Sequence, residues 1–227
     1  MRTESASCLL CGSDAPEQGK SFAFDSFGVV QCRVCGFWYL SPRVPEADMK
    51  EQYQSPSYFD GSGHVGYTEG GGGYGGQERS LRLTFQRFAG RMARYGLNGG
   101  ALLEVGCGTG LFLDASKRYF DHSTGLDLNA QAVKAARKKG FAAIHGDLTK
   151  IREDWLFDCI LSFNVLEHVY DPVNWVQKLG RHLKPGGWMI HATPRIEGLW
   201  FKLFGSRWPS FKIPEHVGFY SKRTLPI

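Results

Sequence analysis

The chain has 227 residues, of which 42% are hydrophobic and 22% are charged, an ordinary composition for a globular protein with one main domain and a small appendage. No apolar run approaches the roughly 18 residues of a membrane-spanning helix. The N-terminus MRTESASCLL lacks the basic and apolar segments of a signal peptide, so we expect a cytoplasmic protein. The net charge is +5, but residues 1–100 carry ten basic and ten acidic residues, so the excess lies entirely in the rest of the chain.

Four of the six cysteines form two Cys-x-x-Cys-Gly turns, CLLCG and CRVCG, in the neutral front part of the chain. Two thiolates on one tight turn can bind a tetrahedral ion, and a second such turn completes a four-thiolate shell. The spacing resembles a zinc ribbon, and disulfides or redox pairs are the alternative. A closed shell leaves no position for a substrate, so the zinc is expected to be structural. The expected zinc ligands are Cys8, Cys11, Cys32 and Cys35, whereas Cys107 and Cys159 are expected to be packed residues.

The first 78 residues divide into a ribbon over 1–41 and a helix with a linker over 42–78. The sequence EADMKEQY predicts a short helix. Nine of the sixteen residues from Gly61 to Gly76 are glycine, which indicates a loop without fixed structure of its own. Tyrosines at 58, 67 and 74 leave open a lid that orders over a ligand. Apolar residues at helical spacing, Leu81, Phe85, Phe88 and Met92, then predict a helix that ends near Gly96.

Strands and helices alternate through residues 79–227. The expected strands cover residues 101–105, 123–126, 142–145, 157–163 and 188–193, and the expected helices begin near 111, 129 and 173. Such alternation is typical of an α/β fold, a Rossmann-like doubly wound parallel sheet with helices on both faces. Ligands of these sheets bind beyond the carboxyl ends of the strands.

The stretch LLEVGCGTGLF places a glycine loop between the first of these strands and its helix. Glycines permit positive φ angles and let a ligand approach the backbone N–H groups. A dinucleotide site would follow G-x-G-x-x-G, but Leu111 stands at the third glycine position. The loop reads G-x-G-x-G instead, so its ligand is decided by residues at the other strand ends.

Carboxylates and an amide follow the next three strands. GLDLN ends the second strand with Asp127, which can accept both hydroxyls of a ribose, and HGDL ends the third with Asp147. Asn164 and the run Leu166–His168 follow the fourth strand. Each has a plainer interpretation, since Asp127 can form a turn before Asn129 and Asp147 can cap the next helical turn.

Together, LLEVGCGTG, GLDLN, GDL, NVLEHVYDP and LKPGGWMI resemble the class I S-adenosylmethionine-dependent methyltransferases over roughly residues 80–225. The front part resembles a subgroup in which a ribbon precedes the catalytic domain. The resemblance implies that Glu104 and the loop Gly106–Gly110 hold the methionine part of the cofactor, Asp127 the ribose, and Asp147 with Leu148 the adenine. Asn164 would line the substrate side. The implied cofactor-binding residues are Glu104, Gly106, Cys107, Gly108, Gly110, Asp127, Leu128, Asp147, Leu148 and Asn164.

Two histidines are candidates for catalysis. A sulfonium methyl is already activated, so the protein mainly aligns the acceptor, but an oxygen acceptor of high pKa also needs a base. His168 follows the fourth strand, and His216 lies in IPEHVGFYS. A structural role is the alternative for both.

The segment GLWFKLFGSRWPSFKIP mixes aromatic and basic residues. It can cover a pocket for an acidic or lipid-linked acceptor, make a peripheral membrane contact, or pack its aromatic residues on the sheet.

The expected acceptor is a small molecule, such as a sugar or another biosynthetic intermediate, as the resemblance suggests. An RNA methyltransferase is the alternative, as is a protein that binds the cofactor without turnover. Residues 1–41 hold three basic and four acidic residues, whereas a module that grips phosphates should be basic. A nucleic-acid partner is therefore not expected.

The related fold usually ends with a helix and two further strands, one of them antiparallel. Only 34 residues follow Thr193, so we expect five parallel core strands, no closing hairpin, and an edge on the fifth strand that needs cover. The missing part would support the acceptor, which predicts cofactor binding with weak turnover in this chain alone.

Overall fold

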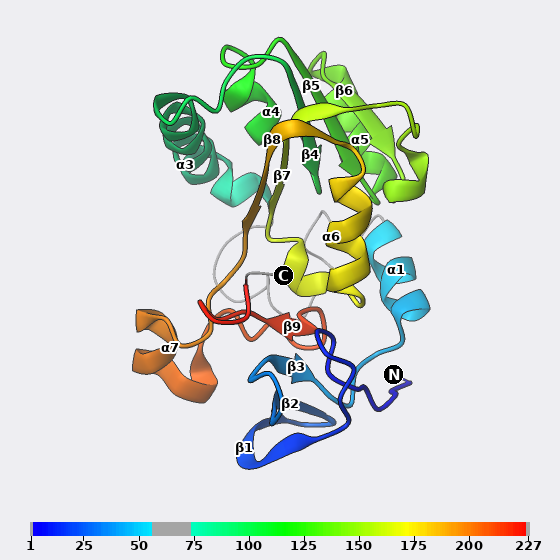
Figure 1. The fold of residues 1–227 in the computed structure, drawn as a ribbon, viewed down its shortest axis with the longest axis vertical. Helices are drawn as coiled ribbons and strands as arrows, with labels where there is room; N and C mark the ends of the chain where they lie inside the picture. The colour runs from blue at the N-terminus through cyan, green and yellow to red at the C-terminus, as the bar shows by residue number, and fades with distance from the viewer. Residues whose placement is uncertain (1, 56–73, 226–227) are drawn as a thin grey trace. The chain divides into compact units, whose positions relative to one another are not determined.

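The computed structural model describes residues 2–55 and 74–225, and the chain forms two compact units (Figure 1). The first unit comprises Met1–Lys50, Asn164–Gln177 and Ala192–Ile227, and the second comprises Glu51–Phe163 and Lys178–His191. These two units differ from the three expected parts of the chain, residues 1–41, 42–78 and 79–227. The division into those three parts stays a prediction. Most of the glycine-rich stretch, and with it the lid, lies outside the described residues.

The second unit is built on a five-stranded sheet of order β6-β5-β4-β7-β8. The strand pairs with a defined register are parallel. Leu102 of the central strand, for example, lies opposite Ser123 of one neighbouring strand and Cys159 of the other. The expected parallel α/β sheet is therefore confirmed. The strands are β4 (Ala101–Val105), β5 (His122–Asp127), β6 (Ala142–His145), β7 (Phe157–Phe163) and β8 (Leu183–Ala192).

Helices α3 (Tyr74–Arg94), α4 (Leu111–Ser116) and α5 (Ala130–Lys138) flank the sheet, and α6 (Pro172–Gly180) connects β7 to β8 (Figure 1). Helix α5 packs against β5 and β6, and α3 packs against α4. Phe85, Phe88 and Met92 of α3 join Leu102 and Phe112 in one apolar cluster, which confirms the expected buried face of this helix.

Two element boundaries differ from those expected. Helix α3 begins at Tyr74, inside the stretch that its glycines marked as a loop. Strand β8 begins at Leu183 rather than Trp188, although Pro185 and Gly186 predicted a turn there. Phe157 N, at the start of β7, donates to His182 O at 2.8 Å. The chain is therefore already bonded to β7 three residues before Pro185.

Within the described residues, no further strand joins this sheet after β8, which leaves β8 at its edge. The later strand β9 (Gly218–Phe219) belongs to the other sheet. The five-stranded core without a closing hairpin is thus confirmed for the described part of the chain. None of the described helices is long and apolar enough to cross a lipid bilayer.

The first unit contains an antiparallel sheet of order β1-β2-β3-β9 (Figure 1). Its strands from the front of the chain are β1 (Pro16–Phe24), β2 (Phe27–Cys32) and β3 (Trp38–Leu40). Trp38 pairs with Phe219 of β9, so a segment from the C-terminal part completes the sheet of the N-terminal part. Helix α1 (Glu46–Gln54) confirms the expected short helix, and helix α7 (Leu199–Phe204) follows β8 in the chain.

Candidate functional site

A glycine loop connects β4 to α4 in the second unit. Gly106 and Gly110 have φ angles of 75° and 79°, which side chains other than glycine rarely adopt. A Cβ atom on Gly110 would lie 2.9 Å from the Phe141 ring, so this position also lacks room. Gly106 N donates to Leu126 O at 2.7 Å, which ties the loop to the end of β5. The loop therefore presents backbone at the carboxyl ends of two neighbouring strands.

Glu104 lies in β4 just before this loop and is only 3% exposed. Its Oε2 atom is buried and has no hydrogen-bond partner among the described residues. Burial, and next the charge of Asp127, raise the pKa of Glu104 well above its ordinary value. A buried carboxylate oxygen without a partner is costly, and a cationic donor from a ligand would remove that cost.

Asp127 ends β5 and contacts the glycine loop directly. Its Oδ2 accepts a hydrogen bond from Gly108 N, and its Oδ1 accepts one from Asn129 N, both at 2.8 Å. A carboxylate offers about four acceptor positions, so Asp127 can form the turn before α5 and still accept bonds from two hydroxyl groups. The turn-forming role and the ligand-binding role are therefore compatible.

Asp147 and Leu148 follow β6, close to the end of β5 in the sheet. The neighbouring Gly146 N donates to Asp127 O at 2.9 Å. Asp147 is exposed, and its Oδ1 accepts from Thr149 N at 3.0 Å and from Thr149 Oγ1 at 2.6 Å. The capping role considered for Asp147 is thus present. Leu128 O contacts His145 Nε2 at 3.1 Å, and Cys107 is a buried residue of the core.

The remaining candidates lie in the first unit. Asn164 directly follows β7, is exposed, and has a φ of 51°. His168 and His216 form a pair, with ring centroids 4.7 Å apart and ring planes at 88°. The structure thus brings together two histidines that are 48 positions apart in the sequence.

Glu167 completes a cluster with these two histidines. Its Oε1 is buried and lies 4.0 Å from His216 Nε2, while its Oε2 accepts from Thr193 Oγ1 at 2.8 Å. The possible ligand atoms of Glu167, His168 and His216 all lie within 4.8 Å of one another, close enough to hold a cation together. Sequence reasoning left Glu167 out of the candidates.

Both histidine rings are fixed in one tautomer. His168 Nδ1 donates to Glu215 O at 3.0 Å, and His216 Nδ1 donates to Ser210 O at 2.8 Å. A carbonyl can only accept, so each neutral ring carries its proton on Nδ1 and has its lone pair on Nε2. The Nε2 atom is therefore the proton acceptor of each ring.

Burial controls the charges of this cluster. It lowers the pKa of His168 to about 4 and raises the pKa of Glu167 to about 7. Burial, and then the charge of His168, hold the pKa of His216 well below its ordinary value. Both imidazoles are therefore neutral at pH 7.

The cluster coincides with a repeated tripeptide in the sequence. Glu-His-Val occurs at 167–169 and again at 215–217. The two copies are joined by the bond from Val217 N to Glu167 O, 2.8 Å, and by the bond from His168 Nδ1 to Glu215 O. One histidine from each copy thereby enters the same cluster.

The four N-terminal cysteines also come together in the first unit. Cys8 Sγ lies 3.5 Å from Cys35 Sγ, and Cys11 Sγ lies 3.6 Å from Cys32 Sγ. A tetrahedral zinc tetrathiolate with bonds of about 2.3 Å has sulfur atoms about 3.8 Å apart, so the four thiols fit this ion. All four cysteines are free of disulfides.

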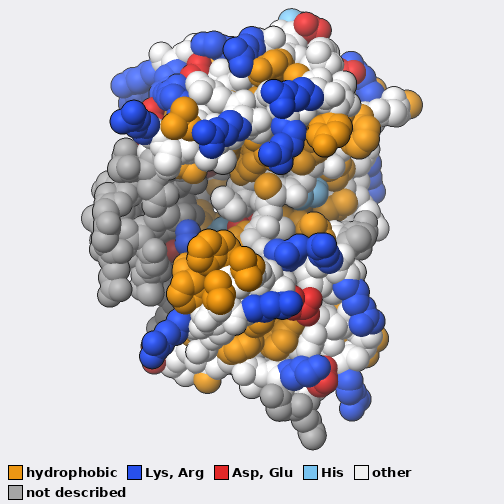
Figure 2. Space-filling view, turned by 90° about the vertical axis from the view of Figure 1, so that its left-hand side faces the viewer, with side chains coloured by type: hydrophobic (Ala, Val, Ile, Leu, Met, Phe, Trp, Pro, Cys, Tyr) orange, Lys and Arg blue, Asp and Glu red, His pale blue; other side chains and the backbone are white. Residues whose placement is uncertain are grey.

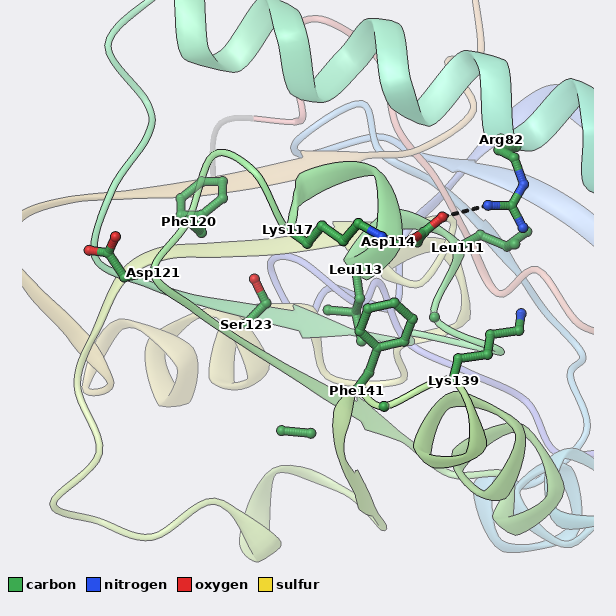
Figure 3. A pocket seen from close by; sticks show the side chains of 13 residues that line it. Arg82, Leu111, Leu113, Asp114, Lys117, Phe120, Asp121, Ser123, Lys139 and Phe141 are labelled. Carbon is green, nitrogen blue, oxygen red and sulfur yellow. Dashed lines mark hydrogen bonds and ion pairs between the residues drawn. The ribbon is translucent and has the colours of Figure 1, made fainter.

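A cavity of about 620 Å³ lies elsewhere in the second unit, around α4 and the start of β6 (Figure 3). Phe120, Ser123 and Phe141 line it, and the ion pair of Arg82 with Asp114 borders it. Neither Glu104 nor Asp127 belongs to its lining, and it shares only Gly110 with the glycine loop. This cavity is therefore separate from the candidate site.

The chain is similar to proteins of known class. A family model described as "Methyltransferase domain" matches residues 77–226. The chain is 31% identical over 141 residues to ubiquinone biosynthesis O-methyltransferase of Paracidovorax citrulli, a match that covers 57% of this chain and 59% of that protein. It is 38% identical over 108 residues to the protein of the same name from Xylella fastidiosa strain M23, covering 44% of each. The chain thus spans about half the length of the curated relatives it matches.

A solved structure shares the fold. The crystal structure of magnesium protoporphyrin IX methyltransferase (ChlM) from Synechocystis PCC 6803 with bound SAH has a TM-score of 0.53, over 70% of this chain and 76% of that one. The identity is 14%, so this likeness concerns the fold alone. Because the family model covers most of the chain, including the whole five-stranded sheet, this protein belongs to the methyltransferase domain family.

Proposed function

We propose that the protein transfers a methyl group from S-adenosylmethionine to a small-molecule acceptor. The observation that carries the proposal is the buried Glu104 carboxylate, which has an oxygen without a hydrogen-bond partner and lies next to the glycine loop. The ammonium group of an amino acid satisfies such an oxygen, whereas a pyrophosphate would be repelled by it. This chemistry favours S-adenosylmethionine over a dinucleotide.

The other residues of the second unit fit the same ligand. In the proposal, Gly106, Gly108 and Gly110 leave room for the methionine part, with Cys107 packed beneath the loop. Asp127 accepts the ribose hydroxyls with the lone pairs that its two backbone bonds leave over. Leu128, Asp147 and Leu148 are assigned to the adenine end, and Asn164 to the substrate side.

The histidine pair is proposed to take the proton of the acceptor. When bound, S-adenosylmethionine supplies a methyl group that is already activated by its sulfonium, so the protein has to orient the acceptor and remove its proton. His168 and His216 each have the Nε2 lone pair needed for this step. Glu167, 4.0 Å from His216 Nε2, would stabilise the resulting imidazolium.

The acceptor is proposed to be a hydroxyl-bearing biosynthetic intermediate, such as a sugar or a ring compound. Support comes from the relatives, which carry the name O-methyltransferase. An RNA acceptor is disfavoured because residues 1–41 hold three basic and four acidic residues, and a zinc tetrathiolate would add negative charge.

A structural zinc ion is proposed for the N-terminal cysteines. The support is the match between their sulfur distances and a tetrahedral shell, together with the tight turns that carry them. Gly12 N donates to Cys8 O and Gly36 N donates to Cys32 O, so the two turns have the same form. The zinc would hold this part of the chain together and take no part in methyl transfer.

The proposal is tested by calorimetry of the purified chain with S-adenosylmethionine, its demethylated product and NAD. We expect binding of the first two and none of NAD. Transfer of a labelled methyl group into fractions of a cell extract, with and without nuclease, then identifies the acceptor class. Label that vanishes after nuclease treatment would replace the small-molecule proposal with the RNA alternative.

A further inference from the structure

Helix α7 presents an apolar face to solvent. Leu199 is 68% exposed, Trp200 65%, Leu203 65% and Phe204 47%. The rings of Trp200 and Phe204 are stacked, with centroids 5.9 Å apart and planes at 13°. We call these four residues the α7 face. Such a concentration of large apolar side chains on six residues indicates a binding surface.

The opposite side of α7 anchors it within the first unit. Phe201 packs edge-on against Trp208 and Phe22, with centroids 5.7 Å away in each case. Phe211 contacts the same cluster and also Phe24 of β1. The aromatic segment of the sequence is therefore divided: Phe201, Trp208 and Phe211 pack inward, whereas the α7 face points outward. The exposed residues are thus held on a packed helix and are not part of a loose loop.

Three of the four charged residues at positions 195–207, around the α7 face, are basic, and Glu197 is the acidic one. Lys202 lies on the helix itself, and Arg195 and Arg207 lie just before and after it, all three exposed. No ion pair joins any of these three to another described residue, so their charges are available to an anionic partner. Figure 2 faces this side of the molecule and shows a cluster of hydrophobic side chains with Lys and Arg side chains beside it.

A lipid surface fits this combination better than a protein. A helix of six residues is about 9 Å long, and a stable protein interface needs about 800 Å² from each partner. Aromatic and leucine side chains flanked by Lys and Arg are typical of segments that insert only about 5 to 10 Å into the headgroup region of an anionic bilayer. The basic flanks supply the charge complementarity with anionic headgroups.

We propose that the α7 face inserts into the surface of an anionic lipid bilayer, with Arg195, Lys202 and Arg207 contacting the headgroups. The contact is peripheral and brings the first unit to the membrane surface. It does not depend on methyl transfer, because none of these residues belongs to the glycine loop or to the histidine cluster.

The test is co-sedimentation of the full chain with vesicles of phosphatidylcholine alone and with phosphatidylglycerol added. We expect binding to the anionic vesicles and at least tenfold weaker binding to the neutral ones. The double variant Trp200→Ser/Phe204→Ser should weaken binding at least tenfold. Lys202→Gln should weaken it about fivefold, the effect of one basic residue at an anionic surface.

Trp188→Ser is the matched control, since Trp188 is 56% exposed but lies on β8 of the second unit. It should bind vesicles as the wild type does, and thermal unfolding verifies that all variants fold. Equal binding by the wild type and the double variant would overturn the proposal, as would wild-type protein that stays in the supernatant. A dimer in light scattering that the double variant dissociates, without vesicle binding, would show that a second copy covers the face instead.

Discussion

Replacing Asp127 by asparagine tests the cofactor assignment at the residue with the best-defined contacts. The carboxylate accepts backbone bonds from Gly108 and Asn129, both at 2.8 Å, and in the proposal it also accepts the ribose hydroxyls. Asparagine keeps one acceptor but presents an N–H₂ group in place of the other. Losing a charge-assisted hydrogen bond costs about 1.5 to 3 kcal/mol, so we expect the affinity for S-adenosylmethionine to fall about ten- to a hundredfold.

Calorimetry should be done in parallel on Asp121→Asn, which alters the other end of the same strand. Asp121 Oδ2 accepts a bond from Gly100 N at 2.8 Å, so this control also weakens a bond between a carboxylate and the backbone, away from the glycine loop. We expect the control to bind S-adenosylmethionine within about twofold of the wild type. Equal losses in both variants would attribute the effect to stability, and unchanged binding by Asp127→Asn would refute the assignment.

Three further results are expected. Glu104→Gln should weaken binding of S-adenosylmethionine about tenfold or more without lowering the thermal midpoint, because the amide keeps the size of the buried side chain but cannot become charged; a lower midpoint with unchanged affinity would contradict this. Elemental analysis should find one zinc per chain, and less than half an equivalent of zinc with intact thiols would exclude the site. Cys8→Ser should lose both the metal and the fold of the ribbon, since zinc binding in such sites contributes on the order of 10 kcal/mol to folding. His216→Asn should reduce methyl transfer about a hundredfold or more with unchanged cofactor affinity, and retained turnover would remove His216 from the mechanism.

The parallel sheet could be predicted because its signals are local. Strands β4, β6 and β7 are short and largely apolar runs that end at a turn, so their positions can be read from consecutive residues. Asp127 could be selected for the same reason, since it ends a strand, whereas Glu104 was selected through the resemblance of LLEVGCGTG to the methyltransferases. Strand β8 begins five residues before the expected position. Pro185 and Gly186 indicate a turn, whereas the pairing with a neighbouring strand that extends β8 cannot be read from consecutive residues.

The histidine cluster and β9 could not be predicted in this way. Strand β9 has only two residues and exists because Trp38 pairs with Phe219, about 180 positions later. The bond from Val217 N to Glu167 O, in the segment just before β9, holds the second Glu-His-Val copy against the first. Contacts between such distant segments depend on the assembled fold. The sequence could therefore indicate the two histidines as candidates, but not that Glu167 lies beside them.

The same cluster makes stability depend on pH in two opposing ways. Burial raises the pKa of Glu167 from 4.5 to about 7, so its contribution to stability is fully present below pH 4.5 and is lost as the pH rises to 7. Burial lowers the pKa of His168 from 6.5 to about 4, so its contribution is present above pH 6.5 and is lost as the pH falls to 4. Each shift corresponds to about 3 kcal/mol, and the two slopes partly cancel in the wild type.

Glu167→Gln removes one of the two slopes. Relative to the wild type, the variant's free energy of unfolding should increase by up to about 3 kcal/mol as the pH rises from 4.5 to 7.5. Over this range the wild type loses the stability linked to the raised pKa of Glu167, whereas glutamine does not titrate. Urea unfolding across this pH range measures the difference, and Glu153→Gln, which alters an exposed glutamate, is the control that should show a constant offset. Parallel curves for Glu167→Gln and the wild type would mean that burial does not raise the pKa of Glu167 in the folded protein, which would refute this account of the pH dependence.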